Sequence, residues 1–145
     1  MPPAYLVLLM LHFVGLAFGV GASFALFTLR RASAELEPAE RIKFMLRALS
    51  VSKNGSYGLL LLLLSGLGMF FMRGPGATMA AGGPAFHAKL TFVVILCGLV
   101  GYSQALGKRL RVAGGGPAAS TLPKVSTAIL LVGIAIIVCA VIAFQ

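Results

Sequence analysis

Very few side chains in this 145-residue chain are suited to chemistry, and they are two histidines and one lysine. His12 and His87 are the only imidazoles, and Lys89 lies two residues beyond His87. Imidazole is a common ligand for metals and for heme iron, and a lysine ammonium binds anionic groups. The three carboxylates, Glu35, Glu37 and Glu40, occupy one short segment, so carboxylate dyads and oxygen-ligand Ca²⁺ or Mg²⁺ cages are disfavoured.

Long apolar segments must position these side chains. The chain is 59% hydrophobic and 10% charged, whereas soluble domains are nearer a quarter charged. Four apolar runs are each long enough to cross a bilayer core of about 30 Å. They cover approximately residues 4–29, 55–72, 85–106 and 125–144. The sequence therefore predicts a single all-α domain, residues 1–145, that forms an integral membrane four-helix bundle.

The basic residues predict the orientation of this bundle. Ten of the twelve lysines and arginines follow the first or the third run, and cytoplasmic loops carry such an excess. We therefore expect both termini outside, in a bacterial-type inner (cytoplasmic) membrane. The net charge of +9 is explained by this pattern, so we expect no nucleic-acid partner.

The first basic loop contains a further helix signal. Pro38 is suited to a helix start, and Ile42, Met45, Leu46 and Leu49 then follow helical spacing. Arg41, Lys43 and Arg47 lie mainly off that apolar stripe. This pattern predicts a short amphipathic helix in the first cytoplasmic loop, lying on the inner membrane face, with a docking helix for a partner as the alternative.

The predicted helix faces suggest where a site could form. His12 shares a stripe with Gly15, Gly19 and Ala22, a small-residue pattern that lets a neighbouring helix approach. A second small-residue face carries His87, Thr91, Val94, Gly98, Gly101 and Ala105. If both faces point inward, a site forms between the first and third helices in the outer half of the bundle. His12 would lie deeper than His87, and a packing histidine bonded to a backbone or hydroxyl group remains the alternative for His12.

Methionines offer a different metal chemistry. Thioethers together with imidazoles form a soft ligand set that suits Cu(I). A copper set would add Met10, Met69 and Met72 to His12 and His87. The methionines match no tight copper motif, so ordinary packing is the alternative for them.

Several short motifs resemble a known superfamily of small four-helix membrane proteins. They are Met10-Leu11-His12, Leu29-Arg30-Arg31, Ser65-Gly66-Leu67-Gly68-Met69 and above all Phe86-His87-Ala88-Lys89-Leu90. The last is similar to the His-x-Lys-Leu opening of the third helix in this superfamily, which includes HemJ-type protoporphyrinogen oxidases and the CopD-type copper resistance membrane domain. The chain departs from the oxidases in three places: it has no Trp, it reads Tyr102-Ser103 where they have Tyr-His, and it reads Leu29-Arg30 where they have Pro-Arg.

The resemblance implies a heme-binding or redox membrane protein. It assigns His12 to heme binding and His87 to the adjacent histidine of the family. Lys89 matches the lysine that the oxidases require, which implies a cofactor-binding and a catalytic role in an oxidoreductase acting on a tetrapyrrole. The expected cofactor is heme b. The alternatives are a copper-handling protein, or a non-catalytic subunit that packs in the bilayer as a homo-oligomer or with other membrane subunits.

Overall fold

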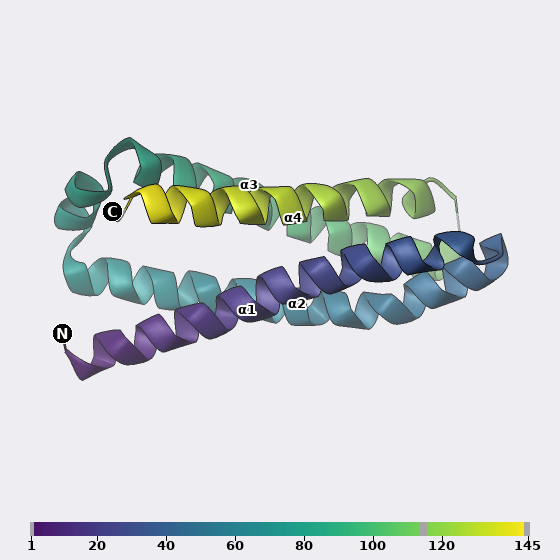
Figure 1. Cartoon of the computed structure of the whole chain (residues 1–145), viewed down its shortest axis with the longest axis horizontal. Helices are drawn as coiled ribbons and strands as arrows, with labels where there is room; N and C mark the ends of the chain where they lie inside the picture. Colours follow the sequence, from purple (N-terminus) through teal and green to yellow (C-terminus); the bar gives the residue numbers. More distant parts are fainter. Residues whose placement is uncertain (1, 114–115, 144–145) are drawn as a thin grey trace.

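Four long helices make up nearly all of the computed structural model, which describes residues 2–113 and 116–143. They are α1 (Pro3–Ala32), α2 (Pro38–Arg73), α3 (Pro75–Ala113) and α4 (Pro117–Ala143), and a short 3₁₀ turn, η1 (Ser33–Glu35), follows α1. The helices run alternately up and down, so α1 begins and α4 ends at the same end of the bundle (Figure 1). Each helix begins with proline, whose missing N–H costs nothing at that position.

The predicted all-α four-helix architecture is confirmed. All four helices are long and apolar enough to cross a membrane, and the described residues contain no strand. Each predicted run lies within one helix, apart from Phe144, which is outside the described residues. At 1.5 Å per residue the 36 residues of α2 extend about 54 Å, well beyond a bilayer core of about 30 Å.

The amphipathic stretch is helical but is not a separate helix. It forms the first three turns of α2, which continues without a break to Arg73. No proline interrupts the sequence between Pro38 and the apolar run, so nothing ends the helix there. The stripe that we expected on the membrane surface instead contributes Met45 and Leu49 to the protein core, where each is at most 9% exposed.

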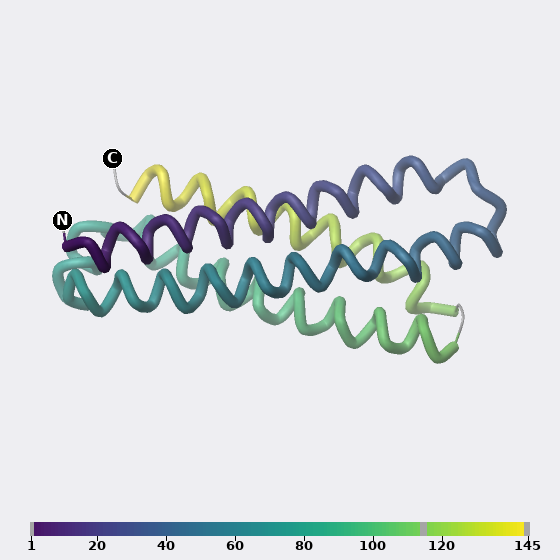
Figure 2. The backbone as a smooth tube through the Cα atoms, turned by 90° about the horizontal axis from the view of Figure 1, so that it is seen from below, coloured from purple at the N-terminus to yellow at the C-terminus, as the bar shows by residue number. Residues whose placement is uncertain are grey.

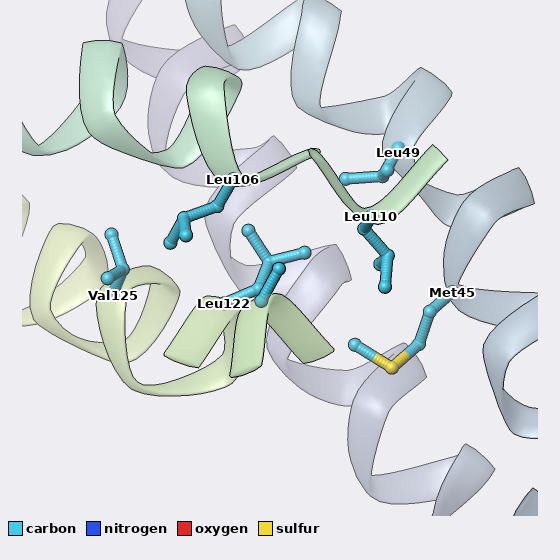
Figure 3. Packing of buried hydrophobic residues seen from close by; sticks show 7 residues of the cluster. Met45, Leu49, Leu106, Leu110, Leu122 and Val125 are labelled. Atoms are coloured by element: carbon cyan, nitrogen blue, oxygen red, sulfur yellow. The ribbon is translucent and has the colours of Figure 1, made fainter. Parts of the chain in front are cut away.

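The helices form two pairs, α1 with α2 and α3 with α4, which are most closely joined at one end. In the view of Figure 1 the two pairs lie apart where α1 begins and come together towards η1, whereas Figure 2 shows that they also cross at an angle. A buried cluster from α2, α3 and α4 fills the converging end (Figure 3). It consists of Met45, Leu49, Leu106, Leu110, Ala118, Leu122 and Val125. We call this the packed end and the opposite one the open end.

Glycines let α1 and α2 cross in close contact. A Cβ added at Gly58 would lie 2.5 Å from the Gly19 nitrogen and 2.8 Å from the Gly15 oxygen. Both neighbours are backbone atoms, which cannot move aside without separating the helices. The predicted small-residue stripe of α1 therefore does receive a neighbouring helix, and that neighbour is α2.

The prediction that the small-residue face of α3 points into the bundle was wrong. The small residues Thr91, Gly98, Gly101 and Ala105 are exposed, and Val94 is 72% exposed. The bundle interior is instead lined from α3 by larger side chains, among them Phe86, Val93 and Leu96. Glycine permits close approach of another helix but does not require it, and this small-residue face of α3 lies on the outside of the bundle.

Candidate functional site

A cavity of about 530 Å³ lies between the two helix pairs. All four helices line it, from Tyr5 and Arg73 at the open end to Arg30 and Leu122 beside the packed end. Most of the lining side chains are aliphatic. Sites for small molecules typically measure about 300–1,000 Å³ and combine apolar walls with a few polar groups. The cavity is therefore of a size and character to hold a mainly apolar ligand.

His12 lines this cavity from α1, and its ring is held by α2. The ring Nδ1 lies 3.0 Å from the Ser65 hydroxyl oxygen. That hydroxyl donates its own hydrogen to the Leu61 carbonyl at 2.6 Å. A serine hydroxyl has a single hydrogen, so with this assignment Ser65 accepts from the Nδ1–H of His12. The lone pair of the neutral ring is then on Nε2, as metal ligation requires.

A glycine makes room for the histidine ring. A Cβ added at Gly66 would lie 3.2 Å from the His12 Cε1 atom, a tight contact. The Ser65-Gly66 pair in the middle of an apolar run thus supplies both a hydrogen-bond partner and space. The bond to Ser65 is equally expected of the alternative, in which His12 is a packing histidine bonded to a neighbouring hydroxyl. This bond alone therefore does not distinguish a packing role from a ligand role.

Lys89 enters the same cavity from α3. Its side chain is half-buried and lines the cavity together with His12. One turn earlier, Phe86 stacks on Phe70 of α2, with the ring centroids 6.1 Å apart. This aromatic contact joins α2 to α3 near the open end. The structure therefore brings His12 and Lys89 to one space, as the sequence predicted.

His87 does not share that space. Its side chain is exposed and is absent from the cavity lining. Its Nδ1–H donates to the carbonyl of Gly83, 2.9 Å away. Gly83, with φ of 51°, and Pro84 form the kink in α3, so the histidine completes a backbone turn there. The predicted pairing of His12 with His87 in one site is not formed.

The candidate copper ligands also diverge. Met69 lines the cavity, but Met10 is 67% exposed and Met72 is 46% exposed. Within residues 2–113 and 116–143, no group of three or more His, Cys, Asp or Glu side chains could hold a metal ion. The soft donors named from the sequence are therefore not assembled around His12.

The sequence analysis did not identify several polar residues in or beside the cavity as partners of a site. Ser65 lies behind His12 and orients its ring, and Arg30 and Ser126 line the end of the cavity nearest the packed end, here called its inner end. Gln104 donates to the Ser56 hydroxyl at 2.8 Å and so links α3 to α2. The available signal was a hydroxyl or amide inside an otherwise apolar run, which needs a partner in the bilayer.

Comparison with known proteins adds no relative. The chain matches no family model, no curated protein and no solved structure. The functional argument therefore rests on the cavity and the residues that line it.

Proposed function

We propose that this protein binds heme in the cavity between its helix pairs, with His12 as the iron ligand. The observation that carries the proposal is the His12 ring, which lines an apolar cavity of about 530 Å³ with its Nδ1 bonded to Ser65. A tetrapyrrole needs apolar walls, an imidazole with an available lone pair, and a cation for its propionates. The aliphatic lining, His12 and Lys89 fit these three needs.

The roles of the protein groups follow from their contacts. Ser65 fixes the orientation of the imidazole, and such outer partners tune both affinity and ligand basicity. Lys89 would attract a propionate by its charge, and the aliphatic walls keep water from the site. Bound heme would supply one-electron redox chemistry. The resemblance of the Phe86–Leu90 motif extends this to an oxidoreductase of the HemJ/CopD-like type, with Lys89 acting on a tetrapyrrole substrate.

Copper is the weaker candidate, because its ligands point in different directions. His12 and Met69 reach the cavity, whereas Met10, Met72 and His87 are exposed. No observation favours a copper site over heme. A protein that binds neither would be a structural subunit, in which the His12–Ser65 bond holds α1 to α2.

The proposal includes an orientation in the membrane. Ten of the twelve basic residues lie near the packed end, so we place that end in the cytoplasm and both termini outside. The expected location is a bacterial-type inner membrane. Cysteines placed at Ala39 and Gly76 test this with a membrane-impermeant thiol reagent, on a background in which Cys97 and Cys139 are replaced. Only the cysteine at position 76 should react in intact cells, and the reverse pattern would contradict the orientation.

The absorption spectrum of the purified protein tests heme binding. The chain should be produced with ample heme, and the wild type should show a Soret band. His12→Ala should abolish or strongly shift this band, because the iron loses its imidazole. His87→Ala is the matched control, since that histidine lies outside the cavity, and its Soret band should remain. Absence of the band from the wild type, or equal loss in both variants, would contradict the proposal, and copper bound instead would favour the alternative.

Charge at Lys89 is tested separately. Lys89→Gln should weaken heme retention about tenfold, as expected for loss of a charged hydrogen-bond partner, while the ligand-sensitive bands stay in place. Lys89→Arg keeps the charge and should restore most of the affinity. Unchanged retention in Lys89→Gln would show that the propionates lie elsewhere.

A further inference from the structure

Arg30 differs from every other basic residue near the packed end. The nine others in that region are exposed, whereas Arg30 is partly buried and lines the cavity. These nine are Arg31, Arg41, Lys43, Arg47, Lys53, Lys108, Arg109, Arg111 and Lys124. An arginine turned into an apolar cavity is costly unless it has polar or anionic partners. Its presence there requires an explanation beyond the positive-inside pattern.

The protein satisfies only part of the hydrogen-bonding capacity of Arg30. Its NH1 group donates to the carbonyl of Pro123 on α4, 3.2 Å away. A guanidinium carries five N–H donors, so others are left for a ligand. The acidic residues Glu35, Glu37 and Glu40 are all exposed, and none of the described residues forms an ion pair with Arg30. Among the described residues, no carboxylate therefore neutralises the positive charge of Arg30 in the cavity.

A second polar group lies one turn from this contact. Ser126 follows Pro123 by three residues on α4, lines the cavity and is only 7% exposed. In the part of the chain that the structure describes, its hydroxyl makes no hydrogen bond, although Thr127 beside it bonds to Pro123. No buried side-chain oxygen or nitrogen of the described residues lacks a partner, so this hydroxyl is reached from the cavity and can donate to a ligand there. Arg30 and Ser126 together provide donors for one anionic group.

Mainly apolar side chains line the cavity beside these donors. Val20, Leu26 and Ile129 are among the residues that line the inner part of the cavity. The ten residues from Arg30 back to Val20 extend about 15 Å, which is half of a bilayer core of about 30 Å. His12 is about 27 Å from Arg30 by the same measure. A chain of one-leaflet length would thus end before the heme site.

We propose that the inner end of the cavity binds a long-chain fatty acid, with its carboxylate on Arg30 and Ser126 and its hydrocarbon chain directed towards Val20. A carboxylate matches the planar fork of a guanidinium, which can hold both oxygens. A single chain suits this end because the helix pairs converge towards the packed core (Figure 1). It shares the cavity with His12 but lies at the other end, about 27 Å away along α1, so binding of the fatty acid does not depend on bound heme.

Palmitate binding to the full-length protein in uncharged maltoside micelles tests this site. Palmitate with a carbon-13 label in its carboxyl group should give one bound resonance per chain, distinct from that of the micelles. Arg30→Gln should weaken binding at least about tenfold, the usual effect of losing a charged hydrogen-bond partner. Arg31→Gln is the matched control, because Arg31 is exposed, and its affinity should equal that of the wild type.

Further measurements distinguish the contribution of the carboxylate from that of the hydrocarbon chain and from an effect on protein folding. Hexadecanol, which has the chain without the charge, should compete at least about tenfold more weakly than palmitate. Val20→Phe narrows the path of the chain and leaves Arg30 in place, so it should also weaken binding even if Arg30→Gln folds poorly. His12→Ala removes the proposed iron ligand and should leave palmitate affinity unchanged, which keeps this test independent of heme binding. Three results would each overturn the proposal. The first is equal binding by Arg30→Gln and the wild type, and the second is equal competition by hexadecanol and palmitate. The third is a phospholipid that is retained at one molecule per chain and that palmitate does not displace.

Discussion

The packed and open ends of the bundle differ in what occupies the space between the helix pairs. At the packed end, leucines from three helices meet, and Leu110 is fully buried. Towards the open end the same pairs separate around a cavity that contains His12 and Lys89. The comparison suggests a division of labour in which one end stabilises the bundle and the other leaves room for a ligand. Such a division is common, because binding sites are often places where stability has been given up.

The largest expected effect is at the packed end. Leu110→Ala should lower the free energy of unfolding by about 2–5 kcal/mol, because it leaves a void in a filled core. Leu59→Ala is the matched substitution in the cavity lining, and it should cost less than half as much because space is already present there. Unfolding in mixed micelles with increasing SDS measures both. Equal losses would mean that the two ends are packed alike.

The crossing of α1 and α2 should show the next largest effect. Gly58→Ala introduces a methyl group against the backbone of Gly19 and should destabilise by about 1–3 kcal/mol, the usual cost of overpacking. Gly98→Ala is the control, since no atom lies within 4 Å of an added Cβ there. It should be neutral or stabilising by up to about 1 kcal/mol, because alanine favours helix more than glycine does. Similar stability of the two variants would argue against the close crossing.

The glycines also show how far the sequence could predict the structure. Run length and composition were sufficient for four membrane helices, and spacing placed His12 on the face of α1 that meets another helix. Spacing could not say which helix that would be. It also treated Gly98 like Gly15, although one is open and the other is covered, because a small residue permits close approach without requiring it. The partner of His12, Ser65, is 53 residues away and depends on the register of α1 against α2.

A smaller effect is expected from the hydrogen bond that orients His12. Ser65→Ala should lower heme affinity about 10- to 100-fold, as loss of an outer partner does at other metal sites. Ser103→Ala is the control: Ser103 also lines the cavity but bonds to the Val100 carbonyl of its own helix. Titration followed at the Soret band measures affinity, and the reduction potential of bound heme should shift only in Ser65→Ala. An unchanged potential in that variant would show that Ser65 does not act on the ligand.

The smallest expected effect concerns the exposed surface near the packed end. Arg47 is exposed on the first turns of α2, beyond the buried stripe that contains Met45. If this end meets a negatively charged leaflet, Arg47→Gln should lower stability by about 1 kcal/mol in nanodiscs of phosphatidylglycerol, the usual contribution of one basic residue near such a surface. In zwitterionic phosphatidylcholine nanodiscs the same substitution should change stability by less than about 0.5 kcal/mol, as surface changes generally do. The same variant is compared in two lipids, so any change in stability caused by loss of the side chain itself is the same in both. The difference between the two lipids therefore measures only the interaction of Arg47 with headgroup charge. A loss of equal size in both lipids would place Arg47 away from the headgroups. The first turns of α2 would then extend beyond the membrane surface, with the packed core standing in water.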